Sequence, residues 1–146
     1  MVRMMKRMRL TVLLMAAVVV FPMAAFGEQE KVITFYPASF TSAMVTDKII
    51  DIDIDHRGVK LGAITFSGNE ALLTVWNRSP NRVKANAAVA LFDQKNRLIA
   101  AQSDSKAGGV GAGKQGNFKI CFKKFLADFS GVARFHLVFV IQESEK

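Results

Sequence analysis

The feature that most constrains this chain is an alternation of apolar and polar residues with a period of two. The clearest example is KIIDIDID, residues 48–55, in which isoleucine and aspartate take turns. Such a pattern puts apolar side chains on one face of a β-strand and polar side chains on the other. VARFHLVFVIQ, residues 132–142, repeats it with larger side chains. Because an apolar sheet face must be covered, we expect two packed layers of strands.

Turn-forming residues divide the rest of the chain into further short β-prone segments. SGNE at 67–70 and DQKN at 93–96 join neighbouring segments into hairpins, and Pro80 ends another. Strands do not alternate with helical segments, so no parallel sheet is expected. The sequence therefore predicts an all-β, immunoglobulin-like antiparallel β-sandwich over residues 48–146.

The first 27 residues differ in kind from the rest of the chain. Basic residues precede an acid-free apolar run at 10–21, and small residues follow it. This order is typical of a secretory signal peptide, and Ala25 and Gly27 place cleavage before Glu28. An uncleaved anchor is the alternative, because a spanning helix needs about 17–25 apolar residues. We expect an exported protein, either periplasmic or extracellular.

The composition without residues 1–27 limits the classes of function. Of 20 basic and 12 acidic residues, four basic ones lie in the leader, which leaves a net charge of +4. This mild excess does not indicate a nucleic-acid partner. Cys121 is the only cysteine, so no intramolecular disulfide can form. We expect one domain stabilised by packing, with no cofactor.

Residues 28–47 are the least patterned part of the chain beyond the leader. KVITFY at 31–36 is β-prone, but the PASFTSAMVTD that follows has no clear period. The expectation is an N-terminal extended segment or an edge strand, and a loop or a free arm stays open.

AGGVGAGKQG, residues 107–116, contains the spacing of a nucleotide-binding phosphate loop in Gly108, Gly113 and Lys114. Gln115 stands where that loop needs a hydroxyl to bind magnesium, and a strand pattern follows in place of a helix. We therefore expect a flexible loop ending in a turn, and no nucleotide partner.

An acidic run beside a histidine raises a metal hypothesis. It comprises Asp51, Asp53, Asp55 and His56. Carboxylates on a straight strand project about 7 Å apart, and a calcium loop needs glycine at its sixth position, where His56 stands. We expect a solvated acidic face that protects an outer strand, with a weak calcium site as the alternative.

Cys121 and the two histidines are the residues that could take part in catalysis. Cys121 as a nucleophile with His136 as its base has no local signature. A metal-dependent hydrolase using Asp53, His56 or His136 has no ligand spacing to support it. We expect no enzymatic activity.

Basic residues near the C-terminus form the strongest cluster of one charge. If the strand at 117–124 pairs with the last strand, they share one sheet face. Phe118 and Phe122 point to the opposite side, which argues against a platform for single-stranded nucleic acid. The candidate partner is an unknown protein or an anionic envelope component. The candidate residues of this face are Lys119, Lys123, Lys124, Arg134 and His136.

Residues 71–122, which include LLTVWNRSPNRVKANAAVALFDQKNRLIAA and AGKQGNFKICF, resemble the FxLYD family and related bacterial immunoglobulin-like modules. The chain departs from the family pattern at Ala112, where proline is usual, at Phe92, where tyrosine is usual, and in the glycine insertion at 107–113. The resemblance implies an accessory or binding role outside the cytoplasm, and no catalytic residues. The matching positions are Val75, Asn77, Val89, Leu91, Phe92, Asp93, Gly113 and Phe118.

The expected function is therefore that of an exported, non-enzymatic module for binding, assembly or envelope support. One alternative is a homo-oligomer that assembles by strand exchange, with residues 28–47 completing the sheet of a neighbouring copy.

Overall fold

The computed structural model describes residues 32–144, of which those from Ile33 onward belong to one compact unit. The leader expected at 1–27 lies outside the described residues, as do residues 28–31. The described part contains no helix that is long and apolar enough to cross a membrane.

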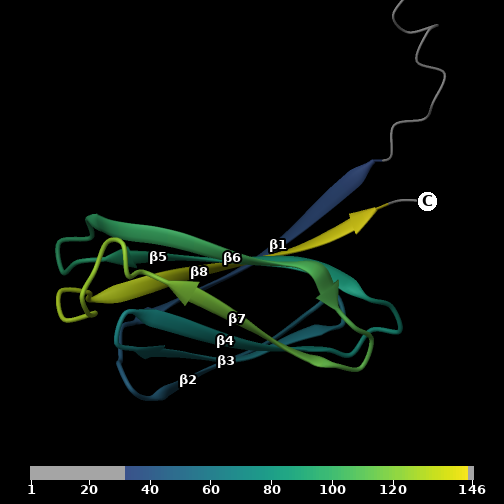
Figure 1. Cartoon of the computed structure of the whole chain (residues 1–146), viewed down its shortest axis with the longest axis horizontal. Coiled ribbons are helices and arrows are strands. Elements are labelled where there is room, and N and C mark those ends of the chain that lie inside the picture. Colours follow the sequence, from purple (N-terminus) through teal and green to yellow (C-terminus); the bar gives the residue numbers. More distant parts are fainter. Residues whose placement is uncertain (1–31, 145–146) are drawn as a thin grey trace, which may run out of the picture. The chain divides into compact units, whose positions relative to one another are not determined.

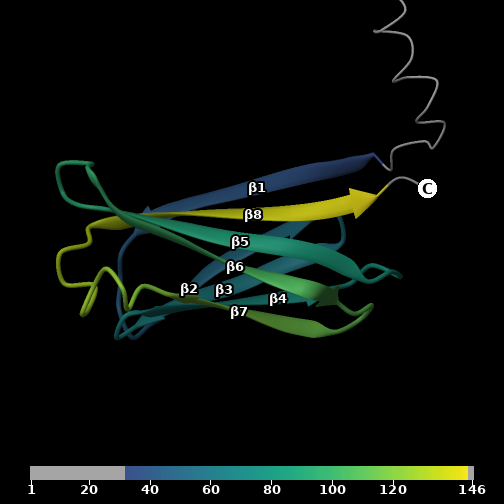
Figure 2. The same cartoon turned by 45° about the horizontal axis from the view of Figure 1, so that its top comes forward.

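Eight strands form two antiparallel sheets that pack face to face (Figure 1). The first sheet has the order β1-β8-β5-β6, and the second has the order β2-β3-β4-β7. Figure 2 shows the two layers, with β1 and β8 side by side at one edge of the first. The predicted all-β, two-layer antiparallel sandwich is thus confirmed. The strands are β1 (Ile33–Ala43), β2 (Ile49–His56), β3 (Val59–Ser67), β4 (Glu70–Asn77), β5 (Val83–Phe92), β6 (Leu98–Val110), β7 (Gln115–Cys121) and β8 (Arg134–Ser144).

The hydrophobic core lies between the sheets and follows the alternation of the sequence. In β4, for example, Ala71, Leu73 and Val75 are fully buried while the residues between them face outward. Aromatic rings fill one end of the core, where Phe66 lies 4.7 Å from Phe135, centroid to centroid. The largest fully buried side chains are Phe66, Phe118, Phe122, Phe135, Phe139, Leu61, Ile64, Leu73, Leu91, Ile120, Leu137 and Ile141.

Residues 33–43, in the segment without a clear period, form β1 at the edge of the first sheet and pair with β8 alone. The strand alternates between exposed and half-buried positions, and none of its residues is fully buried. Tyr36 and Phe40 pack against the core from the half-buried side. Pro37 fits here because an edge strand does not need a hydrogen-bond donor at every position.

The glycine-rich segment is not the loop that the sequence predicts. β6 continues from Leu98 to Val110, and β7 begins at Gln115, so only 111–114 form a turn. Strand pairing resumes beyond the glycines, because Val110 pairs with Val83 in β5, while residues 107–109 form an irregularity between this pair and the pair Lys106 and Ala85. Nothing here resembles a phosphate loop, since β7 follows the turn directly.

At the side formed by β1 and β2, polar contacts join the two sheets. The Nε2–H of His56 donates to the carbonyl oxygen of Tyr36 at 3.1 Å. The guanidinium of Arg57 lies 3.7 Å from the centroid of the Tyr36 ring and bonds both carboxylate oxygens of Glu143, at 3.0 and 3.3 Å. The turn between β2 and β3 is therefore clasped to the β1–β8 edge.

Candidate functional site

The five residues of the predicted basic face do not come together. β7 pairs with β4 and not with β8, so Lys119 lies in the second sheet while Arg134 and His136 lie in the first. Lys123 and Lys124 follow β7 in the loop that leads to β8. The premise that the strand at 117–124 pairs with the last strand is wrong, because alternation shows which way a residue faces but not which strand lies beside it.

The separated basic residues have local partners. The Nζ of Lys119 lies 3.3 Å from a carboxylate oxygen of Glu70. The guanidinium carbon of Arg134 lies 5.4 Å from the centroid of the Phe92 ring. His136 Nδ1 is hydrogen-bonded to the hydroxyl of Thr41 at 2.6 Å. These contacts occupy each group separately and do not build one anion site.

The acidic run faces outward along β2, as the alternation predicts. Asp53 sits at an irregularity in the pairing with β3 and has a positive φ of 50°. Its carboxylate lies 2.9 Å from the Nζ of Lys60, and the hydrogen bond and charge of Lys60 hold the pKa of Asp53 below its usual value. Within residues 32–144, no group of three or more His, Cys, Asp or Glu side chains could hold a metal ion.

The catalytic pairs considered from the sequence are not brought together either. Cys121 is exposed at the end of β7 on the outer face of the second sheet. His136 is on the outer face of the first sheet, where it pairs in register with Thr41 and Ala90. The core therefore separates this thiol from this imidazole.

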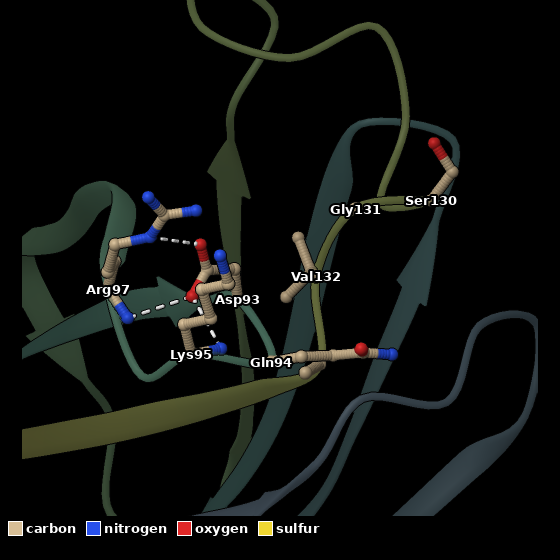
Figure 3. Close-up of a pocket in the computed structure, with 8 residues that line it drawn as sticks. Asp93, Gln94, Lys95, Arg97, Ser130, Gly131 and Val132 are labelled. Atoms are coloured by element: carbon tan, nitrogen blue, oxygen red, sulfur yellow. Dashed lines mark hydrogen bonds and ion pairs between the residues drawn. The ribbon is translucent and has the colours of Figure 1, made fainter.

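A shallow depression at the loop end of the sandwich holds a cluster of polar groups (Figure 3). It has a volume of about 350 Å³ and lies between the β5–β6 hairpin and residues 130–133. The carboxylate of Asp93 accepts the backbone N–H groups of Lys95 and Arg97, each at 2.9 Å, and the Nε–H of Arg97 at 2.8 Å. The backbone hydrogen bond from Arg97 is the main cause of a lowered pKa for Asp93. These hydrogen bonds stabilise the hairpin turn, and the groups that form them bond to one another and not to a ligand.

The outer face of the first sheet carries a feature of another kind. Three consecutive rows of side chains cross all four strands without an Asp, Glu, Lys or Arg. We call these twelve positions the neutral face. From β1 to β6, its rows are Pro37, Val140, Asn86 and Ser105; Ser39, Val138, Ala88 and Ser103; and Thr41, His136, Ala90 and Ala101.

The outer face of the second sheet is charged at its edges and aromatic at its centre. Trp76, on the central strand β4, leaves 48% of its surface exposed. Its neighbours in register are Lys60 on β3 and Gln115 on β7. Trp76 is not among the candidate residues named from the sequence. The alternation of EALLTVWN points Ala71, Leu73 and Val75 inward, and so it predicts that Trp76 faces outward.

Comparison with known proteins does not assign the chain to a family. No family model matches it, so the resemblance to the FxLYD family finds no support, and no curated protein is similar to it. Among solved structures, it is similar to the VP2 subviral particle of infectious bursal disease virus, with 11% identity and a TM-score of 0.36 over 80% of this chain and 30% of that one. It is also similar to one of the carbohydrate-binding modules of the β-sandwich superfamily, with 7% identity and a TM-score of 0.29 over 80% of this chain and 51% of that one. The chain thus spans less than two thirds of either protein.

Proposed function

We propose that this chain is an exported, non-enzymatic binding module, and that it assembles with a second copy of itself through the neutral face. The observation that carries the proposal is the absence of charged residues from twelve contiguous positions on a water-facing sheet. An antiparallel sheet with one solvated face normally carries polar, often charged, side chains there.

Small side chains suit this face to close packing on another sheet. Ala88, Ala90 and Ala101 project little from the backbone, and the two valines of β8, Val138 and Val140, are half-buried between their neighbours. Two sheets pack face to face at about 10 Å when such side chains interdigitate. The neutral face therefore combines small apolar side chains with uncharged polar ones, which can pack closely against a second sheet without burying a charge.

Charge favours a second copy as the occupant. A chain with a net charge of +4 after cleavage repels its own copies over most of its surface. The neutral face is a place where two copies meet without bringing like charges together. Two-fold pairs that use the same patch on both partners are the commonest assemblies.

The neutral face by itself is smaller than a stable interface, so a dimer formed through it is weak. Four strands spaced about 4.8 Å apart, each rising about 3.3 Å per residue from Pro37 to Thr41, give roughly 300 Å² of flat area. Stable interfaces bury about 800 Å² of accessible surface per partner. Phe35 and Leu98, exposed by 58% and 61%, flank the face and add apolar area.

We also propose that the chain is exported and that its sandwich is related to immunoglobulin-like modules. The leader-like composition of residues 1–27 supports export. Two four-stranded antiparallel layers support the immunoglobulin-like relationship, although here the first and last strands are neighbours in one sheet, unlike the ABED and CFG sheets of immunoglobulin constant domains.

The mass of the mature chain in solution, measured by size exclusion with light scattering, tests the assembly. We expect a dimer for the natural chain and a monomer for Val138→Lys, because an ammonium group from each copy would be buried in an interface that offers no counter-charge. Thr65→Lys, on the outer face of the second sheet, is the matched control and should stay dimeric. A natural chain that is monomeric at its highest soluble concentration would contradict the proposal.

Strand exchange through β1 is a second candidate, and one observation favours it. β1 pairs with β8 alone and contributes no fully buried side chain, so it can leave without dismantling the core between the other strands. A neighbouring copy could then supply its own β1, with backbone hydrogen bonds providing the affinity.

A designed disulfide distinguishes exchange from docking. Ala43 and Arg134, which lie outside the neutral face, are directly opposite in register, and opposed residues in antiparallel strands have Cα atoms about 4.5–5.5 Å apart, within disulfide range. In a Cys121→Ser background, the pair Ala43→Cys and Arg134→Cys should give a covalent monomer on a non-reducing gel if β1 stays in its own chain. Covalent dimers or ladders would show exchange.

A further inference from the structure

We propose that the outer face of the second sheet binds an uncharged saccharide, with Trp76 as the platform on which a sugar ring stacks. This site is separate from the neutral face and does not depend on dimer formation. We call it the Trp76 site and define it by Asp53, Lys60, Thr74, Trp76, Gln115 and Asn117.

The indole of Trp76 is both accessible and held in place. It exposes 48% of its surface on a central strand, where a core packing role would bury it. Its Nε1–H points to the carbonyl oxygen of Gly113 at 3.4 Å, and the guanidinium carbon of Arg78 lies 4.8 Å from the ring centroid. A ring held before binding loses little conformational entropy when a ligand arrives.

Hydrogen-bonding groups of several kinds share the sheet face of Trp76. Lys60 and Gln115 are its neighbours in register, and Asn117 pairs with Thr74 in the adjacent row of the same face. The Nζ of Lys60 lies 2.9 Å from the carboxylate of Asp53 on the next strand. Amides, a hydroxyl, an ammonium and a carboxylate on this face together offer both donors and acceptors.

This combination matches the chemistry of a neutral sugar. The C–H groups on one face of a pyranose ring pack against the apolar face of an indole, while the hydroxyls around the ring bond to amides and carboxylates. The ion pair between Asp53 and Lys60 neutralises two of the charged groups on this face, and the guanidinium of Arg78 adds a positive charge beside the ring.

Other ligand classes fit the Trp76 site less well. A phosphate-rich ligand would meet the three aspartates along β2, at 51, 53 and 55. A nucleic-acid strand needs several aromatic platforms in a positively charged groove, whereas Trp76 is the only tryptophan of the chain. A protein partner would bury the exposed Leu72 and Ile49 of this face together with Trp76. A Leu72→Ala variant therefore also distinguishes a protein-type apolar contact from a sugar contact centred on the indole.

The single tryptophan makes the test direct, because all indole emission of the protein comes from Trp76. We would titrate the full mature chain with three neutral polysaccharides, namely a xylan, a mixed-linkage β-glucan and a galactomannan. Polygalacturonate serves as an acidic control. A saturable change in emission with at least one neutral polymer is expected, and no change with any of the three would overturn the proposal. A response to polygalacturonate alone would overturn it as well.

Electrophoresis in gels that contain the binding polymer then assigns the contact. Trp76→Ala should weaken retardation roughly tenfold or more, as expected for loss of a central aromatic contact. Leu72→Ala is the matched control, since Leu72 is exposed by 44% on the same face of the same strand and should leave retardation unchanged. Equal retardation of the natural chain and Trp76→Ala would refute the site. Dimer mass should be unaffected by Trp76→Ala, so failure here is distinguishable from failure of the assembly proposal.

Discussion

The carboxylate of Asp104, on β6, accepts a hydrogen bond from the backbone N–H of Lys119, on β7, at 2.9 Å. β6 is an edge of the first sheet and β7 is an edge of the second, so this bond joins the two layers where the strand order leaves both open. It also occupies an N–H on the free side of β7. An acid near the interior of an edge strand thus closes one side of the sandwich and discourages pairing with another chain.

Loss of that carboxylate should loosen this side of the sandwich. We predict that Asp104→Ala lowers the free energy of unfolding by about 1 kcal/mol, the contribution of a partly solvated hydrogen bond to a charged group. Asp104→Asn, which keeps an acceptor oxygen, should lose less. Urea unfolding measures both, and amide exchange at Lys119 should quicken in the alanine variant. Unchanged exchange at Lys119 would show that the bond does not form in solution.

The alternation of the sequence predicts which residues of a strand face the core, because facing is a local property of a pleated chain. Ile52 in β2 and the buried residues of β8 follow it. The full length of β6 could not be predicted from the sequence, because residues 101–105, AQSDS, are small or polar at every position and show no alternation. An edge strand with one half-covered face needs few large apolar residues, so its pattern is weak.

Partner strands could not be predicted in the same way. The pairing of β7 with β4 depends on contacts far apart in sequence, and the alternation of NFKICFKKF is equally compatible with β8 as the neighbour. The prediction of one shared basic face was wrong for this reason. The neutral face could not be found either, since it exists only once β1, β8, β5 and β6 are placed side by side.

Gly109 is required by backbone geometry, and its neighbour Gly108 is not. Gly109 has a φ of +76°, and a Cβ added there would lie 2.8 Å from the carbonyl oxygen of Val83. A Cβ on Gly108 would meet nothing within 4 Å. We predict that Gly109→Ala costs about 1–3 kcal/mol of stability, while Gly108→Ala stays within about 0.5 kcal/mol of the natural chain. Thermal unfolding of the two variants compares them, and equal melting temperatures would mean that the segment relaxes freely.

Asn77 is the one fully buried polar residue found in the described part of the chain, and all its hydrogen-bonding capacity is used. Its Nδ2 donates to the carbonyl oxygens of Asn81 and Val110, at 2.8 and 2.9 Å. Its Oδ1 accepts the backbone N–H and the hydroxyl of Ser79, at 3.0 and 2.6 Å. The amide therefore ties the end of β4 to the following loop and to the end of β6.

Removal of this amide should be costly because it leaves the buried carbonyl oxygen of Val110 without the hydrogen bond from Asn77 and opens a cavity at a fully buried position. We predict that Asn77→Ala lowers the free energy of unfolding by about 3 kcal/mol. Ser79→Ala is the control, and it should cost about 1 kcal/mol because Oδ1 keeps the backbone N–H of residue 79. Urea titration followed by circular dichroism gives both values. A smaller loss for Asn77→Ala than for Ser79→Ala would mean that water replaces the amide.

The β5–β6 hairpin should make stability depend on pH through Asp93. Hydrogen bonds from Arg97 and Lys95 hold the pKa of Asp93 in the folded protein below its ordinary value of 3.8. A lowered folded-state pKa adds stability that is fully present above the unfolded-state pKa and is lost as the pH falls through the folded-state pKa. At pH 7 the natural chain should therefore have a higher melting temperature than Asp93→Asn. This difference in melting temperature should disappear at pH below about 4, where the protonated acid resembles the amide. Asp51→Asn, at an exposed position of β2, controls for the change in net charge. If the difference in melting temperature between the natural chain and Asp93→Asn is the same at low pH, the substitution acts through the geometry of the hairpin and not through the charge of Asp93.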